Sequence, residues 1–125
     1  MKNKPTESEL EVLSLLWQNG PMTVRRIHDM IRVDREIGYT TTLKIMQIMH
    51  EKGLLDRKKE GKTHIYSNKV DQVKTQKGLV SKMIRTVFQG SSKDLVMQAL
   101  GNSNPTKEEL DEIRTYLDKL NEGQK

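Results

Sequence analysis

The spacing of the apolar residues changes at Gly53, and this change restricts the fold more than any other feature of the sequence. Up to Gly53, apolar side chains recur at every third or fourth position, which is typical of amphipathic helices. Two short β-prone runs follow, at residues 54–59 and 63–67, with Glu60-Gly61-Lys62 between them. Gly61 occupies the position at which a tight hairpin turn needs a positive φ. The first half of the chain is therefore predicted to hold helices followed by one β-hairpin.

Capping residues divide the helical part into three segments. Thr6 and Glu9 have the spacing of a capping box, and Gly20-Pro21 ends the first helix because proline cannot continue the hydrogen-bond ladder. Thr23 caps the second helix, and Gly53 is the expected C-cap of the third. The predicted helices cover residues 7–18, about 24–33 and 40–52. Three short helices and a charged hairpin form the winged-helix pattern, so we predict a mainly α fold with a small β wing.

Three further helices are predicted after residue 70. Residues 71–89 would form a helix about 28 Å long, since each residue adds about 1.5 Å. Ser92 is the expected cap of the next helix and Gly101 its end, and Thr106 with Glu109 forms a second capping box. The apolar stripes of these helices exceed what so small a tail can bury alone, which favours packing against a second copy. The residues predicted to form this dimer contact are Val80, Ile84, Val87, Phe88, Leu95, Leu110, Ile113 and Leu117.

The predicted division of the chain is thus a winged-helix domain at residues 1–70 and a helical dimerisation region at residues 71–125. The composition agrees with a core that a second copy of the chain completes. Apolar residues make up 34% of the chain, and the 8 glycines raise this fraction only to roughly 40%, whereas an average domain has about 45–50%. The absence of cysteine excludes disulfide scaffolds, thiol catalysis and cysteine-based metal centres. No signal peptide precedes the first helix, and patches such as Val12–Trp17 are too short to span a bilayer, so we expect a cytoplasmic protein without membrane insertion.

Charge is concentrated in the middle of the chain. The formal net charge is +5, but residues 25–93 hold sixteen basic and seven acidic side chains, whereas residues 94–125 hold four and seven. A local excess of this size favours binding to a polyanion, although a merely solvated surface would also explain it. Only five aromatic residues are present, which argues against RNA modules that stack bases on exposed rings.

The third helix and the hairpin carry the side chains best suited to DNA. Short hydroxyl side chains at the start of a helix, followed by longer polar ones, suit the major groove, and Gln can pair with adenine. A role as helix N-cap would explain one of the threonines Thr40, Thr41 and Thr42, but not all three. For the basic wing, the alternative is a hairpin whose charges are only solvated. Recognition helix 40–52 and wing 57–66 supply most of the predicted contacts: Arg25, Arg26, Thr40, Thr41, Thr42, Lys44, Gln47, Arg57, Lys58, Lys59, Lys62 and His64.

Other chemistry has little support in the sequence. GxGxxG and GxxxxGK[ST] are both absent, so no nucleotide-binding loop is predicted. His28, His50 and His64 fall in three separate elements without metal-ligand spacing, and nothing resembles a nucleophile elbow or a triad. We therefore predict no enzyme activity, no metal site and no cofactor.

Four segments resemble the penicillinase-repressor family, the BlaI/MecI/CopY group of bacterial transcriptional regulators. The resemblance covers about residues 6–120. Its most specific parts are the acidic helix that ends in Leu-Leu-Trp, the YTTT start of the third helix, the EKGLL exit and the Gly-x-x-x-x-Tyr-Ser wing. The segments are TESELEVLSLLW at 6–17, Val24–Ile31, YTTTLKIMQIMHEKGLL at 39–55 and GKTHIYS at 61–67.

The resemblance implies a homodimer that represses transcription from a dyad-symmetric DNA operator. In the antibiotic-resistance members, a membrane sensor metallopeptidase leads to cleavage of an Asn-Phe bond in the tail, which breaks the dimer. The aligned pair here is Gln98-Ala99, which becomes the candidate cleavage site. Copper-responsive members carry a cysteine-rich metal motif, and the lack of cysteine excludes that mode of induction here.

Two functions of different classes follow from the sequence. The first is a homodimeric repressor that reads an operator through residues 40–52 and the wing. The second is a protein-interaction adaptor whose helical tail binds another protein and whose winged helix does not read DNA sequence. Salt-dependent binding to a dyad sequence and a dimeric mass would distinguish the repressor from the adaptor.

Overall fold

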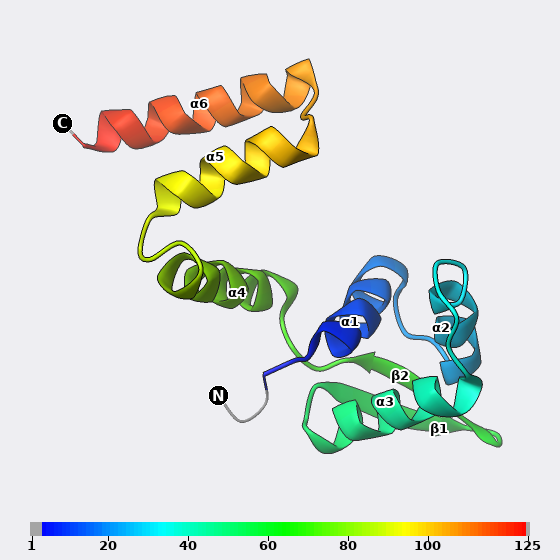
Figure 1. The fold of residues 1–125 in the computed structure, drawn as a ribbon. Helices are drawn as coiled ribbons and strands as arrows, with labels where there is room; N and C mark the ends of the chain where they lie inside the picture. Colours follow the sequence, from blue (N-terminus) through cyan, green and yellow to red (C-terminus); the bar gives the residue numbers. More distant parts are fainter. Residues whose placement is uncertain (1–3, 125) are drawn as a thin grey trace. The chain divides into compact units, whose positions relative to one another are not determined.

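A computed structural model describes residues 4–124, with six helices and one hairpin in the order α1, α2, α3, β1, β2, α4, α5, α6 (Figure 1). The chain divides into two compact units, Met1–Lys77 and Gly78–Lys125. The predicted boundary at residue 70 lies just before α4, Gln72–Thr86, and the division between the units falls within that helix.

The first unit begins with three helices: α1 at Glu7–Asn19, α2 at Val24–Ile31 and α3 at Tyr39–Glu51. The predicted capping box of α1 is confirmed, because the Thr6 hydroxyl accepts from Glu9 N–H while the Glu9 carboxylate accepts from Thr6 N–H. Thr23 caps α2 as predicted, accepting from Arg26 N–H. Each helix therefore begins within one residue of its predicted start.

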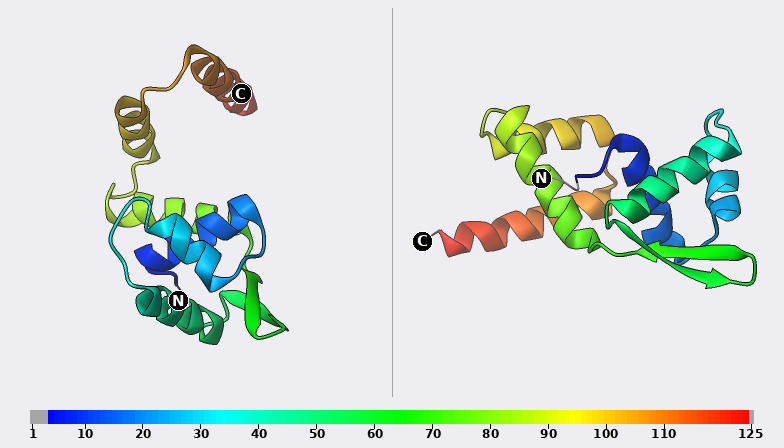
Figure 2. Two further views of the ribbon diagram at one scale, coloured as in Figure 1. Left: turned by 90° about the vertical axis from the view of Figure 1, so that its right-hand side faces the viewer. Right: turned by 90° about the horizontal axis from the view of Figure 1, so that it is seen from below.

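Strands β1, Leu55–Glu60, and β2, Thr63–Asn68, form the predicted antiparallel hairpin, with Leu55 opposite Asn68 and Glu60 opposite Thr63. Gly61 has φ +62°, as the turn requires. The turn is the free end of the hairpin in both views of Figure 2. A short bridge joins Met22 to Tyr66 through a reciprocal pair of backbone hydrogen bonds of 3.0 and 2.9 Å. The bridge attaches the base of the hairpin to the segment between α1 and α2.

The core of the first unit collects apolar side chains from all three helices and both strands. Its members, all buried, are Val12, Leu13, Leu16, Met22, Val24, Ile27, Ile31, Met46, Met49, Leu54, Leu55 and Tyr66. Tyr66 is the largest side chain that is fully enclosed, so the wing strand β2 is part of the core as well as of the surface. The fold is a winged helix-turn-helix, which confirms the predicted class.

The second unit contains the end of α4 together with α5, Ser92–Ser103, and α6, Lys107–Gly123. The capping box of Thr106 and Glu109 is confirmed at the start of α6. Two predicted details are wrong. Ser91, not Ser92, caps α5 by accepting from Asp94 N–H, and Gly101 lies inside α5, because Asn104 supplies the left-handed residue that ends the helix.

Gly20 terminates α1 with φ +84° and ψ −175°. This combination belongs to a region of backbone space that is essentially restricted to glycine, so the role of Gly20 is more specialised than an ordinary left-handed cap. Across residues 4–124, no helix is both long and apolar enough to cross a membrane.

Candidate nucleic-acid interface

Helix α3 has one polar exposed face and one buried face. Thr40, Lys44 and Gln47 follow each other at intervals of four and three residues, so they share the face that is turned to solvent, and all three are exposed. Thr41 is exposed beside them. The opposite face, with Met46 and Met49 fully buried, packs into the core. The exposed face therefore offers two hydroxyls, an ammonium and an amide within about two turns.

The start of α3 is not capped by a side chain. Gly38 occupies the N-cap position, and no side-chain hydrogen bond reaches the first turn. The threonines thus do not form the N-cap, and this rules out the capping interpretation of the threonine run. The first turn also lacks acidic residues. A helix start of this kind attracts phosphate through its N–H groups and its dipole.

Thr42 is a correction to the predicted contact set. Its side chain is completely buried, and its Oγ1 lies 2.9 Å from His28 Nδ1, which is also buried. Thr42 precedes Met46 by four residues and therefore lies on the core face of α3. It cannot reach a ligand at the surface of this structure. Its hydroxyl and the imidazole instead satisfy each other inside the contact between α2 and α3.

Arg25 and Tyr39 meet at the starts of α2 and α3. The Arg25 guanidinium carbon lies 4.3 Å from the centroid of the Tyr39 ring. That ring and the His28 imidazole form a T-shaped pair, with centroids 5.5 Å apart and planes at 84°. Arg25 and the neighbouring Arg26 are both exposed. The sequence predicted both arginines as DNA contacts but did not predict that Tyr39 contacts Arg25.

Glu9 and Lys52 connect α1 to the end of α3. Lys52 Nζ lies 2.6 Å from Glu9 Oε1 and also donates to the Lys4 carbonyl at 3.3 Å. Burial raises the pKa of the Glu9 carboxyl, but the hydrogen bonds from Lys52 and Thr6 and the Lys52 charge outweigh it, so the pKa lies below the ordinary 4.5. The ionised pair is therefore the stable form at neutral pH, and it holds the C-terminal end of α3 against α1.

The cations of the wing are exposed but do not share one face. Side chains alternate along a strand, so Arg57 and Lys59 lie on one side of the hairpin and Lys58 on the other, while Lys62 is in the turn. His64 is half-buried, with its ring 6.3 Å from that of Tyr66. The hairpin can therefore present two or three cations to one strand of a polyanion, with His64 contributing less than predicted.

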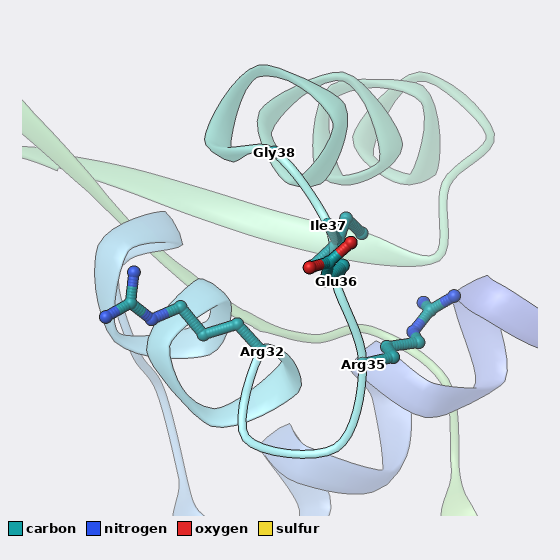
Figure 3. A pocket seen from close by; sticks show the side chains of 5 residues that line it. All are labelled: Arg32, Arg35, Glu36, Ile37 and Gly38. Carbon is teal, nitrogen blue, oxygen red and sulfur yellow. The ribbon is translucent and has the colours of Figure 1, made fainter.

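A hollow at the turn between α2 and α3 is lined by Arg32, Arg35, Glu36, Ile37 and Gly38. Arg32 and Arg35 point away from each other, as Figure 3 shows. Arg35 Nη2 donates to Glu11 Oε1 at 2.7 Å, which ties the turn to α1. The polar groups of the hollow do not converge on one point, so it lacks the arrangement of a small-molecule site.

The predicted dimer contact residues lie on α4, α5 and α6 or directly after α4, and none of them is buried within a single chain. Val87 is 68% exposed and Leu117 is 52% exposed, while Ile84, Phe88, Leu95 and Ile113 are half-buried. Gln98 and Ala99 are exposed in the middle of α5. Unit two therefore carries an apolar surface without a partner in the described chain.

A helix-turn-helix pair, a β-hairpin and an exposed polar face on the second helix of the pair together define a winged-helix protein of the DNA-binding class. The chain belongs to the penicillinase repressor family, whose family model matches residues 5–119. This confirms the family that the sequence segments resemble.

Several relatives match along almost their whole length. The methicillin resistance regulatory protein MecI of Mammaliicoccus sciuri is 27% identical over 126 residues, covering 95% of this chain and 99% of the relative. MecI of Staphylococcus aureus strain N315 is 26% identical with the same coverage. The penicillinase repressor of Staphylococcus aureus is 20% identical over 123 residues, covering 96% of this chain and 98% of the relative.

Proposed function

We propose that the protein is a homodimeric transcriptional repressor that binds double-stranded DNA at a dyad-symmetric operator. The observation that carries this proposal is the exposed face of α3, which presents Thr40, Lys44 and Gln47 to solvent. Contacts of Thr42 with His28 and of Lys52 with Glu9 hold this helix near its two ends. In helix-turn-helix proteins, the second helix of the pair enters the major groove and reads base edges from its N-terminal half. These side chains suit that role.

Phosphate contacts would set the position of α3 on the duplex. Arg25 and Arg26 at the start of α2, and Arg57, Lys58, Lys59 and Lys62 in the hairpin, are all exposed. Cations placed on both sides of a reading helix fix its register without carrying sequence information, while base-edge contacts supply specificity. The repressor role is also supported by the names of the relatives, which describe them as a regulatory protein of methicillin resistance and a penicillinase repressor.

Dimerisation would use the apolar surface of α4, α5 and α6. None of the residues in these three helices is buried in a single chain, although Val80, Met83, Leu110, Leu117 and Leu120 are large apolar residues. Exposed apolar surface of this extent favours association, and a two-fold axis lets the same surface cover itself. Two winged helices brought together in this way would match a dyad operator with half-sites one helical turn or slightly more apart.

Relief of repression by cleavage of the tail is the remaining part of the proposal. The candidate bond, Gln98–Ala99, lies within α5, so a protease would need a local opening of that helix to reach an extended backbone. Cleavage there would separate α6 from the rest of the dimer surface. Mass analysis of the chain from induced cells would show a fragment ending at Gln98 if this step operates.

The proposal is tested with a duplex recovered by selection from a random-sequence pool. We expect the recovered sequence to have dyad symmetry, the protein to have twice the mass of one chain in sedimentation, and the binding constant to fall steeply as salt is raised. A matched duplex with one inverted half-site is the control and should bind far more weakly. Recovery of no sequence preference, together with a shallow salt slope, would favour the protein-interaction adaptor instead.

A further inference from the structure

The Arg25 guanidinium lies in an electrostatically unusual place. It belongs to the first turn of α2 and stacks on Tyr39, the first residue of α3, so it stands beside the positive ends of two helix dipoles. The first turns of α1, α5 and α6 carry acidic residues that offset such dipoles, but those of α2, α3 and α4 carry none. A cation in this position is poorly compensated within the chain, and an anion would relieve the repulsion.

The stacking geometry leaves the hydrogen-bond donors of Arg25 available. The Arg25 guanidinium carbon lies over the Tyr39 ring, 4.3 Å from its centroid. A guanidinium that stacks on an aromatic face directs its N–H donors outward in its own plane. Among residues 4–124, the Arg25 side chain has no hydrogen-bond or ion-pair partner. The planar group can therefore be fixed by the ring and still offer its fork of N–H groups to a phosphate.

Tyr39 is itself held in place from the core side. Its ring and the buried imidazole of His28 form a T-shaped pair, and that imidazole is hydrogen-bonded to the buried hydroxyl of Thr42 at 2.9 Å. The contacts form one continuous series from Thr42 through His28 and Tyr39 to Arg25. Tyr39 is 36% exposed and belongs to the first turn of α3.

We propose that Tyr39 is a positioning residue, which holds the Arg25 guanidinium at the start of α3 so that it meets a backbone phosphate of bound DNA. This role rests on the proposed function. An exposed arginine normally loses rotamer freedom on binding, and a side chain ordered beforehand avoids part of that loss. Arg26 provides a natural comparison, because it is the adjacent exposed arginine and contacts no aromatic ring among the described residues.

The experiment is a pair of double-mutant cycles on binding to the selected duplex. Tyr39→Leu should weaken binding about two- to tenfold and reduce the salt slope by up to about 0.9 for each phosphate that the variant no longer neutralises. Tyr39→Phe keeps the ring and should bind like the wild type. Arg25→Gln should weaken binding at least as much as Tyr39→Leu, and Arg25→Gln with Tyr39→Leu should be no weaker than Arg25→Gln alone.

The second cycle uses Arg26→Gln, whose effect should add to that of Tyr39→Leu. If the Arg25 and Tyr39 effects are also additive, Tyr39 does not act through Arg25 and the proposal is overturned. A structural role would instead lower the melting temperature and leave the salt slope unchanged, which would likewise overturn it.

An NMR measurement on the DNA-free protein separates this inference from the proposed function. The Arg25 side-chain protons should show a ring-current shift that Tyr39→Phe retains and Tyr39→Leu abolishes. If that shift is present but the wild-type chain shows no salt-dependent DNA binding, the proposed function fails, and the role at phosphate fails with it. If binding is present but the shift is absent, only the positioning role fails.

Discussion

The Nδ1 atom of His28 lies 2.9 Å from the Oγ1 atom of Thr42, and both side chains are buried between α2 and α3. This is the polar contact at the centre of the helix-turn-helix pair. In an apolar surrounding, a polar group without its partner bears the full cost of its desolvation. The contact should therefore determine how firmly α3 is held relative to α2.

Thr42→Val tests this contact, because valine preserves the shape of threonine but removes the hydroxyl. We expect the free energy of unfolding of the first unit to fall by about 1–3 kcal/mol, since the imidazole of His28 then remains unpaired. Thr41→Val at the exposed neighbour is the control and should change stability by no more than about 0.5 kcal/mol. Equal urea midpoints for the two variants would show that the hydroxyl contributes nothing.

Glu9→Gln should change how stability depends on pH. The Glu9 pKa is lowered in the folded chain, so its ionisation stabilises the fold above the unfolded pKa, and this contribution is lost as pH falls through the folded value. The wild-type free energy of unfolding should therefore drop below pH 4.5, and the drop should be smaller in the variant. At neutral pH, the variant should be less stable by about 1–3 kcal/mol, because a hydrogen bond to a charged group is removed.

The control for this measurement is Glu7→Gln, on the exposed side of the same helix. Urea titrations at intervals from about pH 3 to about pH 7 compare the three proteins. A pH profile of Glu9→Gln that runs parallel to that of the wild type would mean that the pair with Lys52 is not formed in solution.

Gly20→Ala should destabilise the first unit. The backbone of Gly20 has φ +84° and ψ −175°, which alanine adopts only with strain of about 1–3 kcal/mol, even though a Cβ atom would meet nothing within 4 Å. Gly101→Ala makes the same chemical change inside α5, where alanine favours the helix by about 0.5–1 kcal/mol. Thermal melting should thus show opposite shifts for the two variants, and a shared direction would contradict the argument.

Gln47→Ala should relax operator preference without affecting the fold. If Gln47 makes a bidentate contact to a base, its replacement should reduce discrimination at one base pair per half-site by about 1–3 kcal/mol. The side chain is exposed, so the melting temperature should hardly change. Selection experiments on this variant, on Thr41→Ala and on Gln18→Ala, an exposed position of α1, would show whether the effect is confined to α3. If both α3 variants kept full sequence specificity, α3 would not be the helix that reads the bases.

Ile84→Asp combined with Leu117→Asp should produce monomers. Both residues lie on the predicted dimer contact, and two carboxylates per chain in an apolar interface would remain unpaired. Sedimentation at a fixed concentration gives the mass. The control carries Ser81→Asp and Thr115→Asp, exposed polar positions on the same helices, and should remain dimeric. A dimer that survives the first pair of changes would show that these helices do not form the contact.

Local signals in the sequence predicted most of the fold. The capping boxes at Thr6 and Thr106 and the turn at Gly61 depend on residues close together in the chain, and all three are confirmed. The end of α5 was predicted wrongly, because Gly101 and Asn104 are both acceptable left-handed caps and the local sequence does not distinguish between them. The bridge between Met22 and Tyr66 joins segments that are far apart in the sequence, so no local sequence pattern predicts it.

The candidate site was predicted less completely. The helical period of α3 predicts that Lys44 and Gln47 are exposed, as they are. The same period places Thr42 in the core, but its hydroxyl group favoured a DNA contact, and that prediction was wrong. Thr42, Met46 and Met49 are spaced as one helical face, and this signal could have identified the threonine as a core residue. His28 was missed for a similar reason, since it lies four residues after Val24 and three before Ile31, both buried.

If a second copy covers the unburied apolar residues of α4, α5 and α6, as proposed, gene dosage affects how much repressor assembles. A surface completed by a second copy forms according to the square of the chain concentration when that concentration is low. Operator occupancy would then fall more than proportionally when the supply of chain is halved. A promoter under such control would switch over a narrow range of repressor abundance, with the steepness arising from assembly alone.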